Sequence, residues 1–131
     1  RTLVRKEANM FQLDLKSGMP ICDQIVSGFI RLKAVGALKA DDQMPSVRAL
    51  ASKFSVNPNT IQKAYAVLES KGIIYSVKGK GSFISDDENS YIAIKEAALG
   101  DVAQAAKNAL EVGVSKNEII AVVEKESGVK I

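Results

Sequence analysis

The sequence has no histidine and no tryptophan, and it has only one cysteine. The absence of histidine excludes nucleophilic sites that pair serine or cysteine with histidine, and it excludes metal sites that use imidazole. Cys22 cannot form a disulfide within the chain, which fits a reducing compartment such as the cytoplasm. Aromatic residues make up only 5% of the chain, so the core must consist mainly of Leu, Ile, Val and Ala.

Long apolar runs are also absent. No stretch approaches the roughly 20 consecutive apolar residues that span a bilayer, and no signal peptide is recognisable. We therefore expect a cytoplasmic protein with no membrane partner. No nucleophile–base pair, metal set or cofactor loop is present, so we expect neither an enzyme nor a bound cofactor or metal. Residues 1–10 show no clear pattern, and we interpret them as an N-terminal arm or a leader.

Positive charge is concentrated in the middle of the chain. Residues 46–84 contain six Lys and Arg residues and a single acid, Glu69, which gives 6 − 1 = +5. Residues 91–131 contain five Lys and six acids, or 5 − 6 = −1. Such a basic segment favours a polyanionic partner, although a solvated lysine-rich surface is the plain alternative.

Three segments show the apolar spacing of amphipathic helices. The first is expected over residues 21 to about 38, the second over 46–54 and the third over 58 to about 71. Their expected buried positions are, in order: Ile25, Phe29, Leu32 and Val35 or Gly36; Val47, Leu50, Ala51 and Phe54; Ile61, Ala64, Tyr65 and Leu68.

The second and third helices are separated by only about three residues, which is the spacing of a helix-turn-helix. Ser46 and Asn57 are natural N-caps for them, because their side chains can accept hydrogen bonds from free backbone N–H groups. Pro58 suits the first helical position, where a missing N–H has no cost. Ser55 stands in the turn, where glycine is common in such motifs.

The exposed face of the third helix carries side chains that can read DNA bases. Asn59 and Gln62 can form bidentate hydrogen bonds with adenine, the methyl group of Thr60 can contact thymine, and Lys63 can reach guanine or phosphate. An ordinary polar helix surface would look similar. The basic hairpin that follows favours the DNA-binding interpretation.

That hairpin is predicted from two runs of strand-forming residues, 73–77 and 82–84. The turn between them consists of Lys78, Gly79, Lys80 and Gly81. Residues 86–89 are predicted to be an acidic, polar linker at the domain boundary. After it, helical patterning resumes and ends at Gly113. Ser115 and Glu118 form a capping box that opens a last helix, which ends near Gly128.

The two helices of this tail form a helical hairpin with too little partner surface within its own chain. We therefore expect residues 91–123 to pair with a second copy of the chain. The residues expected at this homodimer contact are Ala98, Val102, Ala105, Ala109, Ile119 and Val123.

The run from Met44 to Ile84, MPSVRALASKFSVNPNTIQKAYAVLESKGIIYSVKGKGSFI, resembles the DNA-binding domain of the GntR family of bacterial regulators. Residues 20–25, PICDQI, are similar to the opening of that domain's first helix. The VNPNT stretch and the short helical tail resemble the YtrA subfamily. The resemblance covers residues 11–85 and implies a winged helix that binds a palindromic double-stranded DNA operator as a homodimer, usually as a repressor.

Residue by residue, the resemblance implies that Arg48, the arginine of the PSxR motif, contacts DNA. It also implies DNA contacts at the start of the third helix and at the hairpin tip or wing. With the flanking Ser46 and Lys63, the predicted DNA-binding residues are Ser46, Arg48, Asn57, Asn59, Thr60, Gln62, Lys63, Lys78, Gly79, Lys80 and Gly81. Many family members have arginine where this chain has Pro58, so their operators do not transfer to it.

The sequence thus predicts a mainly α-helical fold with a small β-hairpin: a winged helix-turn-helix domain over residues 11–85 and an α-helical dimerisation region over residues 86–131. The predicted function is sequence-specific transcription regulation. A winged helix that binds proteins and has lost specific DNA binding is the alternative. The operator, the regulated genes and the existence of a small-molecule effector stay open.

Overall fold

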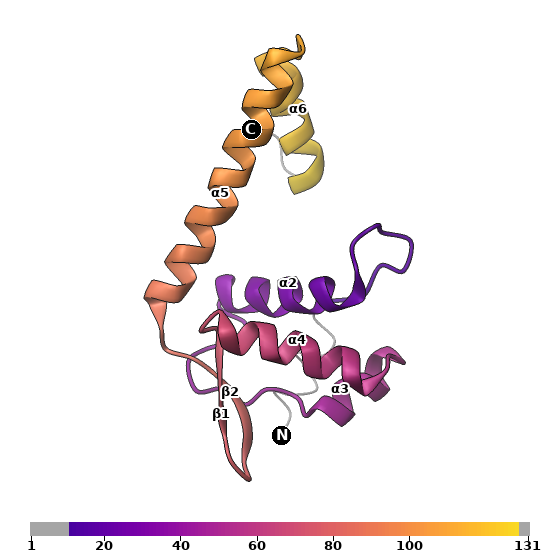
Figure 1. Ribbon diagram of the computed structural model, residues 1–131, viewed down its shortest axis with the longest axis vertical. Helices are drawn as coiled ribbons and strands as arrows, with labels where there is room; N and C mark the ends of the chain where they lie inside the picture. Colours follow the sequence, from indigo (N-terminus) through magenta and orange to yellow (C-terminus); the bar gives the residue numbers. More distant parts are fainter. Residues whose placement is uncertain (1–10, 129–131) are drawn as a thin grey trace. The chain divides into compact units, whose positions relative to one another are not determined.

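The computed structural model describes residues 11–128, so the predicted arm or leader over residues 1–10 lies outside the described residues. Its elements, labelled as in Figure 1, are α2 (Ile21–Ala34), α3 (Val47–Phe54), α4 (Pro58–Ser70), β1 (Ile74–Val77), β2 (Gly81–Ile84), α5 (Glu88–Glu111) and α6 (Lys116–Ser127). The chain divides into two units, the first ending at Tyr91 and the second beginning at Ile92. This mainly helical architecture with one hairpin is the predicted fold.

The core of the first unit lies between α2, α3 and α4. In Figure 1, α2 runs alongside α4, and α3 lies against α4 on another side. Phe29 at the centre is fully buried, and its ring meets Tyr65 and Phe11 edge to face at centroid distances of 6.0 Å and 5.3 Å. Gly28 allows Phe11 to approach α2, because a Cβ at this position would lie 2.7 Å from the Phe11 ring.

The first helix ends four residues earlier than the spacing predicts. Gly36 has a φ of +80°, and the chain reverses so that the N–H groups of Ala37 and Leu38 both donate to the Leu32 carbonyl. Val35 and Gly36, the two alternatives predicted for the last buried position, are both exposed, and Leu38 enters the core instead. The helical period fails here because a glycine-centred C-terminal turn replaces the last helical turn.

The predicted helix-turn-helix positions are confirmed. Ser46 and Asn57 cap α3 and α4, and all four predicted core positions of α4 are buried. The α3 stripe is buried at Leu50 and Ala51 and half-buried at its two ends. Ser55 adopts the left-handed conformation, with φ +54° and ψ +47°, at the end of α3.

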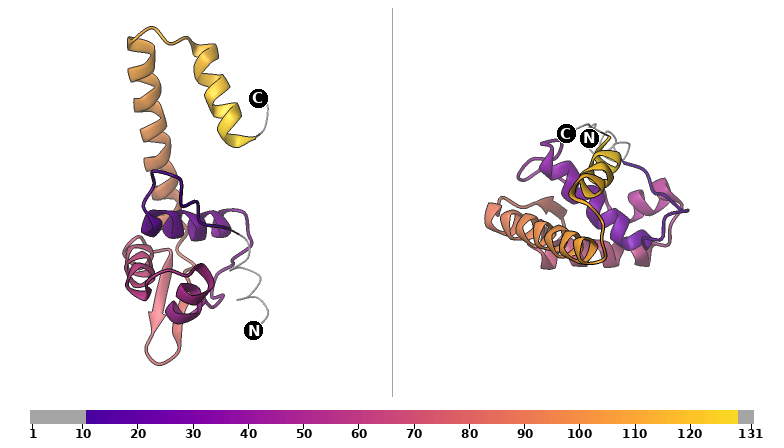
Figure 2. Two further views of the ribbon diagram at one scale, coloured as in Figure 1. Left: turned by 90° about the vertical axis from the view of Figure 1, so that its right-hand side faces the viewer. Right: turned by 90° about the horizontal axis from the view of Figure 1, so that it is seen from above.

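The two strands form an antiparallel hairpin with Tyr75 opposite Phe83 and Val77 opposite Gly81. Both Figure 1 and the left view of Figure 2 show this hairpin projecting from the helices of the first unit. Ile74 and Ile84, at its base, are buried and join it to the core. Gln43 forms an isolated bridge with Phe83, so the segment before α3 lies along the free edge of β2.

The acidic segment at residues 86–89, predicted as a linker, instead leads directly into a helix. α5 begins at Glu88, and Asp87 accepts hydrogen bonds from the Ser90 backbone (3.1 Å) and hydroxyl (2.7 Å). These bonds lower the pKa of the Asp87 carboxyl. Gly72, with φ +77°, lies close to Ser90, and a Cβ on Gly72 would overlap the Ser90 hydroxyl.

In the second unit, α5 continues to Glu111 and α6 follows after a turn at Gly113, whose φ is +94°. The predicted capping box is present: Ser115 and Glu118 exchange hydrogen bonds of 2.7 Å and 3.1 Å, which lower the pKa of the Glu118 carboxyl. None of the described residues from 92 to 128 is buried. The apolar side chains of this unit therefore have no interior of their own.

Candidate nucleic-acid interface

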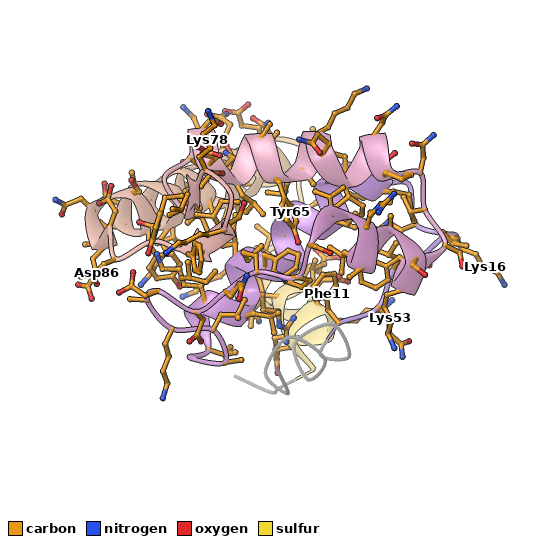
Figure 3. The ribbon with its side chains drawn as sticks, turned by 90° about the horizontal axis from the view of Figure 1, so that it is seen from below. Phe11, Lys16, Lys53, Tyr65, Lys78 and Asp86 are labelled. Atoms are coloured by element: carbon orange, nitrogen blue, oxygen red, sulfur yellow. The ribbon has the colours of Figure 1, made fainter. Side chains whose placement is uncertain are left out.

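The amphipathic character of α4 determines which of its side chains are available to a partner. Ile61, Ala64 and Tyr65 hold one face in the core, where the Tyr65 hydroxyl donates to the Pro45 carbonyl at 2.6 Å. Burial raises the pKa of the Tyr65 phenol well above its ordinary value. Figure 3 shows Tyr65 pointing into the centre of the domain, whereas Lys53 and Lys78 point outwards.

The other face of α4 presents the predicted base-reading residues. Asn59, Gln62 and Lys63 are exposed, and Thr60 is half-buried. Asn59 and Gln62 are three residues apart and therefore lie on neighbouring positions of the same helix face. Amide and ammonium groups on an exposed helix face can make hydrogen bonds to base edges in a major groove.

The N-cap residues have part of their hydrogen-bonding capacity committed already. The Asn57 side-chain oxygen accepts from the Asn59 N–H at 2.8 Å, and the Ser46 hydroxyl oxygen accepts from the Ala49 N–H at 3.0 Å. Both side chains still have donor hydrogens to offer. Asn57 and Ser46 are therefore suited to donate to phosphate oxygens, whereas Asn59 can use both its donor and its acceptor.

Arg48 is exposed in the first turn of α3. Helix α3 has no acidic residue in this turn that would offset the guanidinium charge. Arg48 is the second residue of α3, and the backbone N–H groups at a helix N-terminus also favour anions. This combination suits a phosphate or a base at the edge of a groove.

The wing tip is basic and made compact by its glycines. Lys78 and Lys80 are exposed, and Gly79 and Gly81 adopt φ values of +77° and +113°. Only glycine takes up such values readily, so the turn can be tight and its backbone can approach a ligand closely. One hydrogen bond of 2.9 Å, from the Lys80 N–H to the Val77 carbonyl, closes the turn.

The structure brings the wing tip together with the N-terminus of α3. Ser46, Lys80 and Gly81 line one hollow of about 230 Å³, and Tyr65 also contributes to its wall. Two predicted site segments that are far apart in sequence are therefore neighbours in space.

Other kinds of site find no support in the described part of the chain. In residues 11–128, no group of three or more His, Cys, Asp or Glu side chains could hold a metal ion. Over the same residues, no helix combines the length and apolarity needed to cross a membrane.

The residues predicted for dimerisation are all exposed or half-buried in the second unit. Most of them share one apolar groove of about 460 Å³ between α5 and α6, which is lined by Val102, Ala105, Ala106, Ala109, Val114, Ile119, Val122 and Val123. Ala98 is exposed but does not line this groove.

Two contacts of the wing were not predicted from the sequence. The Tyr75 hydroxyl donates to the Asp41 carboxylate at 2.7 Å, which raises the pKa of Tyr75, and the Gln43 side-chain amide donates to the Lys80 carbonyl at 3.2 Å. Both join residues more than thirty positions apart. No local sequence pattern marks such pairs, because they depend on which edge of the hairpin the preceding segment follows.

A helix-turn-helix with an exposed polar second helix and a basic hairpin beside it defines the winged helix-turn-helix class of DNA-binding proteins. Residues 34–84 match the pattern of the bacterial regulatory proteins of the gntR family. The transcriptional repressor YtrA of Bacillus subtilis is 44% identical over 78 residues, which span 60% of this chain and 60% of YtrA.

A second B. subtilis regulator, YhcF, is 33% identical over 113 residues, which cover 86% of this chain and 90% of YhcF. The solved structure of a GntR family transcriptional regulator from Listeria monocytogenes is 35% identical in sequence, and the match has a TM-score of 0.70. It covers 85% of this chain and 98% of the Listeria chain. This chain belongs to the GntR family and is a DNA-binding transcriptional regulator, not an enzyme.

Proposed function

We propose that the protein is a repressor that binds a palindromic operator as a homodimer, with α4 in the major groove and the wing on the flanking backbone or minor groove. The observation that supports this most directly is the division of α4 into a core face and an exposed face bearing Asn59, Gln62 and Lys63. The net charge of +5 over residues 46–84 supplies the attraction to phosphate.

Base reading is assigned to Asn59 and Gln62, whose side-chain amides are exposed at the start of α4. A recognition helix presents its first turns to base edges when its N-terminal end enters the groove. Losing one bidentate amide–adenine contact costs about 1–3 kcal/mol of discrimination. Arg48, Lys63 and the wing lysines are assigned mainly to the backbone, where they set affinity and register.

The test begins with selection of operator duplexes from a random-sequence library by the purified chain. Binding to every single-base variant of the selected site is then compared between the wild type, Asn59→Ala, Gln62→Ala and Lys63→Ala. The two amide variants should relax the preference at particular base pairs while leaving affinity for mixed-sequence DNA nearly intact. Lys63→Ala should weaken binding to all sequences alike.

Unchanged preference profiles in both amide variants would contradict the assignment of base reading to this face. Failure of the wild type to select any sequence would favour the alternative of a protein-binding winged helix. A salt titration distinguishes that alternative further, because each phosphate contact steepens the loss of affinity with salt by about 0.9 log units per log unit.

The homodimer is supported by the second unit. Its exposed apolar side chains include Leu99, Leu110 and Val122, and its groove between α5 and α6 is almost wholly apolar. An isolated pair of helices with no buried residue gains little from tertiary packing, which supplies most helical stability in proteins. A second copy would cover this surface and place two recognition helices on the two halves of a palindrome.

The oligomeric state tests this proposal. Val102→Asp places a charge in the groove and should shift the dimer towards monomer in sedimentation equilibrium at micromolar concentration. Val112→Asp is a matched control, because Val112 is 80% exposed and does not line the groove. A wild type that stays monomeric, or equal weakening by both substitutions, would contradict this dimer.

Repression, as opposed to activation, is supported by the relative YtrA, which is a repressor. Transcription in vitro from a promoter that contains the selected site should fall when the purified chain is added. A rise would identify an activator.

A further inference from the structure

The segment before α3 runs along the hairpin as a short third strand would. The Met44 N–H donates to the Ser82 carbonyl and the Ile84 N–H donates to the Asp42 carbonyl, both at 2.8 Å. Between them, Gln43 forms a bridge with Phe83. The same segment continues through Pro45 into Ser46, the N-cap of α3.

The Gln43 side chain extends this pairing to the wing tip. Its amide nitrogen donates to the carbonyl of Lys80, the residue just before β2, at 3.2 Å. The same nitrogen would lie 3.5 Å from a Cβ placed on Gly81. Gln43 thus joins the wing tip to the residues that lead into α3. It also lines the hollow that Ser46 and Lys80 share.

The base of the wing has a separate anchor. Tyr75 stacks on Phe83 with a centroid distance of 5.6 Å and donates to Asp41. A two-stranded hairpin with four residues per strand is marginally stable by itself. The base is therefore fixed without the Gln43 side chain. Nearer the tip, Val77 pairs with Gly81 and the Ser76 hydroxyl donates to Glu69. At Lys80 itself, the turn hydrogen bond and the Gln43 side chain act on its backbone N–H and carbonyl.

We propose that Gln43 is a positioning residue of the DNA interface, which holds Lys80 at a fixed distance from Ser46 and Arg48 so that α3 and the wing tip meet the duplex together. Gln43 itself needs no DNA contact. It lowers the conformational entropy that the wing tip loses on binding, which is the general effect of preorganisation. The inference rests on the proposed function, in which the wing contacts DNA.

The test uses Gln43→Met in the 131-residue chain, because methionine keeps the length of the side chain and removes the N–H donor. Gln12→Met, at an exposed position outside the wing, is the matched control. Affinity for the selected operator duplex should fall about 3- to 10-fold in Gln43→Met, the range expected for one exposed hydrogen bond, and should stay unchanged in the control.

A double-mutant cycle separates positioning from a general structural effect. In a Lys80→Ala background, Gln43→Met should have no further effect on DNA affinity, because Gln43 acts through Lys80. In the free protein, ¹⁵N relaxation should show increased motion of the Gly79, Lys80 and Gly81 amides in Gln43→Met, with the Tyr75 amide unchanged.

Additive losses in the cycle, or unchanged affinity in Gln43→Met while Lys80→Ala weakens binding, would overturn the assignment of Gln43 alone. Unchanged affinity in Lys80→Ala itself would remove the wing tip from the DNA interface and overturn both the proposed wing contact and this inference. The two failures are therefore distinguishable.

Discussion

The two units of the chain differ in whether they form a buried core of their own. All seven aromatic residues, four Phe and three Tyr, lie in the first unit, which ends at Tyr91. Its side chains form a buried core around Phe29 and Leu68. The second unit has no aromatic residue, and none of its described residues is buried.

This difference shows how a small regulator can divide stability and assembly between its parts. The first unit can hold a recognition helix rigidly because one face of that helix is fixed by a core. The second unit leaves its apolar surface exposed, and the proposed second copy would cover it. Substitutions in the first unit should therefore act at any protein concentration, whereas those in the groove of the second should depend on concentration.

The largest effect is expected from Phe29→Ala, which removes the fully buried ring between Phe11 and Tyr65. The free energy of unfolding of the first unit should fall by about 3–5 kcal/mol. Tyrosine absorbance monitors this unit specifically, because Tyr65, Tyr75 and Tyr91 all belong to it. The same loss should appear at 1 and at 100 times a given protein concentration. A loss that disappears at high concentration would mean that the first unit also depends on a partner copy.

A smaller effect is expected at Gly72, which lies against Ser90 in the first turn of α5. Alanine there would have to keep a φ of +77° and would overlap the Ser90 hydroxyl, so we expect a loss of about 2–3 kcal/mol. Urea unfolding followed by tyrosine absorbance measures it.

Gly79→Ala is the matched control for Gly72→Ala. Gly79 has the same φ of +77°, but a Cβ there would meet no atom within 4 Å. Gly79→Ala should therefore lose only the free energy that an alanine needs to adopt this positive φ. Equal losses in both variants would show that the Ser90 contact contributes nothing.

The sequence predicted most of the fold because its signals were local. Helix caps and apolar spacing each depend on residues within one or two helical turns. The caps are Ser46, Asn57 and Ser115, and the spaced apolar residues include Leu50, Ile61 and Leu68. The same spacing also predicted the exposed face of α4, because the positions that are not apolar face away from the core.

The predictions failed where the structure depends on a turn or on residues that are far apart in the sequence. Val35 was predicted to be buried because the helical period was extended past a turn at Gly36. The start of α5 was missed because Asp87 and Glu88 resemble a solvated acidic linker until the Ser90 hydrogen bonds are seen. Gln43 has no local signature, because its partner Lys80 is 37 residues away.

An intermediate effect is expected from Tyr65→Phe, which removes the hydrogen bond to the Pro45 carbonyl while keeping the ring that packs on Phe29. Pro45 is fully buried, so its carbonyl would lose a partner away from water. We expect a loss of about 1–2 kcal/mol at neutral pH, measured by urea unfolding.

The pH dependence of this difference provides a second measurement. The folded protein raises the pKa of Tyr65 above its ordinary value of 10.0, so the unfolded chain releases this proton first. The stabilisation is complete below pH 10 and declines as the pH rises above it. Wild type and Tyr65→Phe should therefore converge in stability above pH 10. A constant difference up to pH 11 would contradict the burial of a neutral phenol.

The smallest effect is expected at Ser55, and it is a gain in stability. Ser55 has φ +54° in the turn between α3 and α4, a conformation that costs an L-residue with a Cβ about 1–2 kcal/mol. Glycine adopts it without that cost but loses more backbone entropy on folding, about 0.5–1 kcal/mol. Ser55→Gly should therefore stabilise the first unit by about 0.5–1 kcal/mol, measured as a shift of the urea midpoint with an unchanged slope.

Ser52→Gly, within α3, is the opposing control and should destabilise the first unit by a similar amount, because glycine is unfavourable inside a helix. Since the turn belongs wholly to the first unit, neither change should alter the proposed dimerisation through the second unit. A loss of stability in Ser55→Gly would mean that the serine side chain contributes more to the turn than its backbone conformation costs.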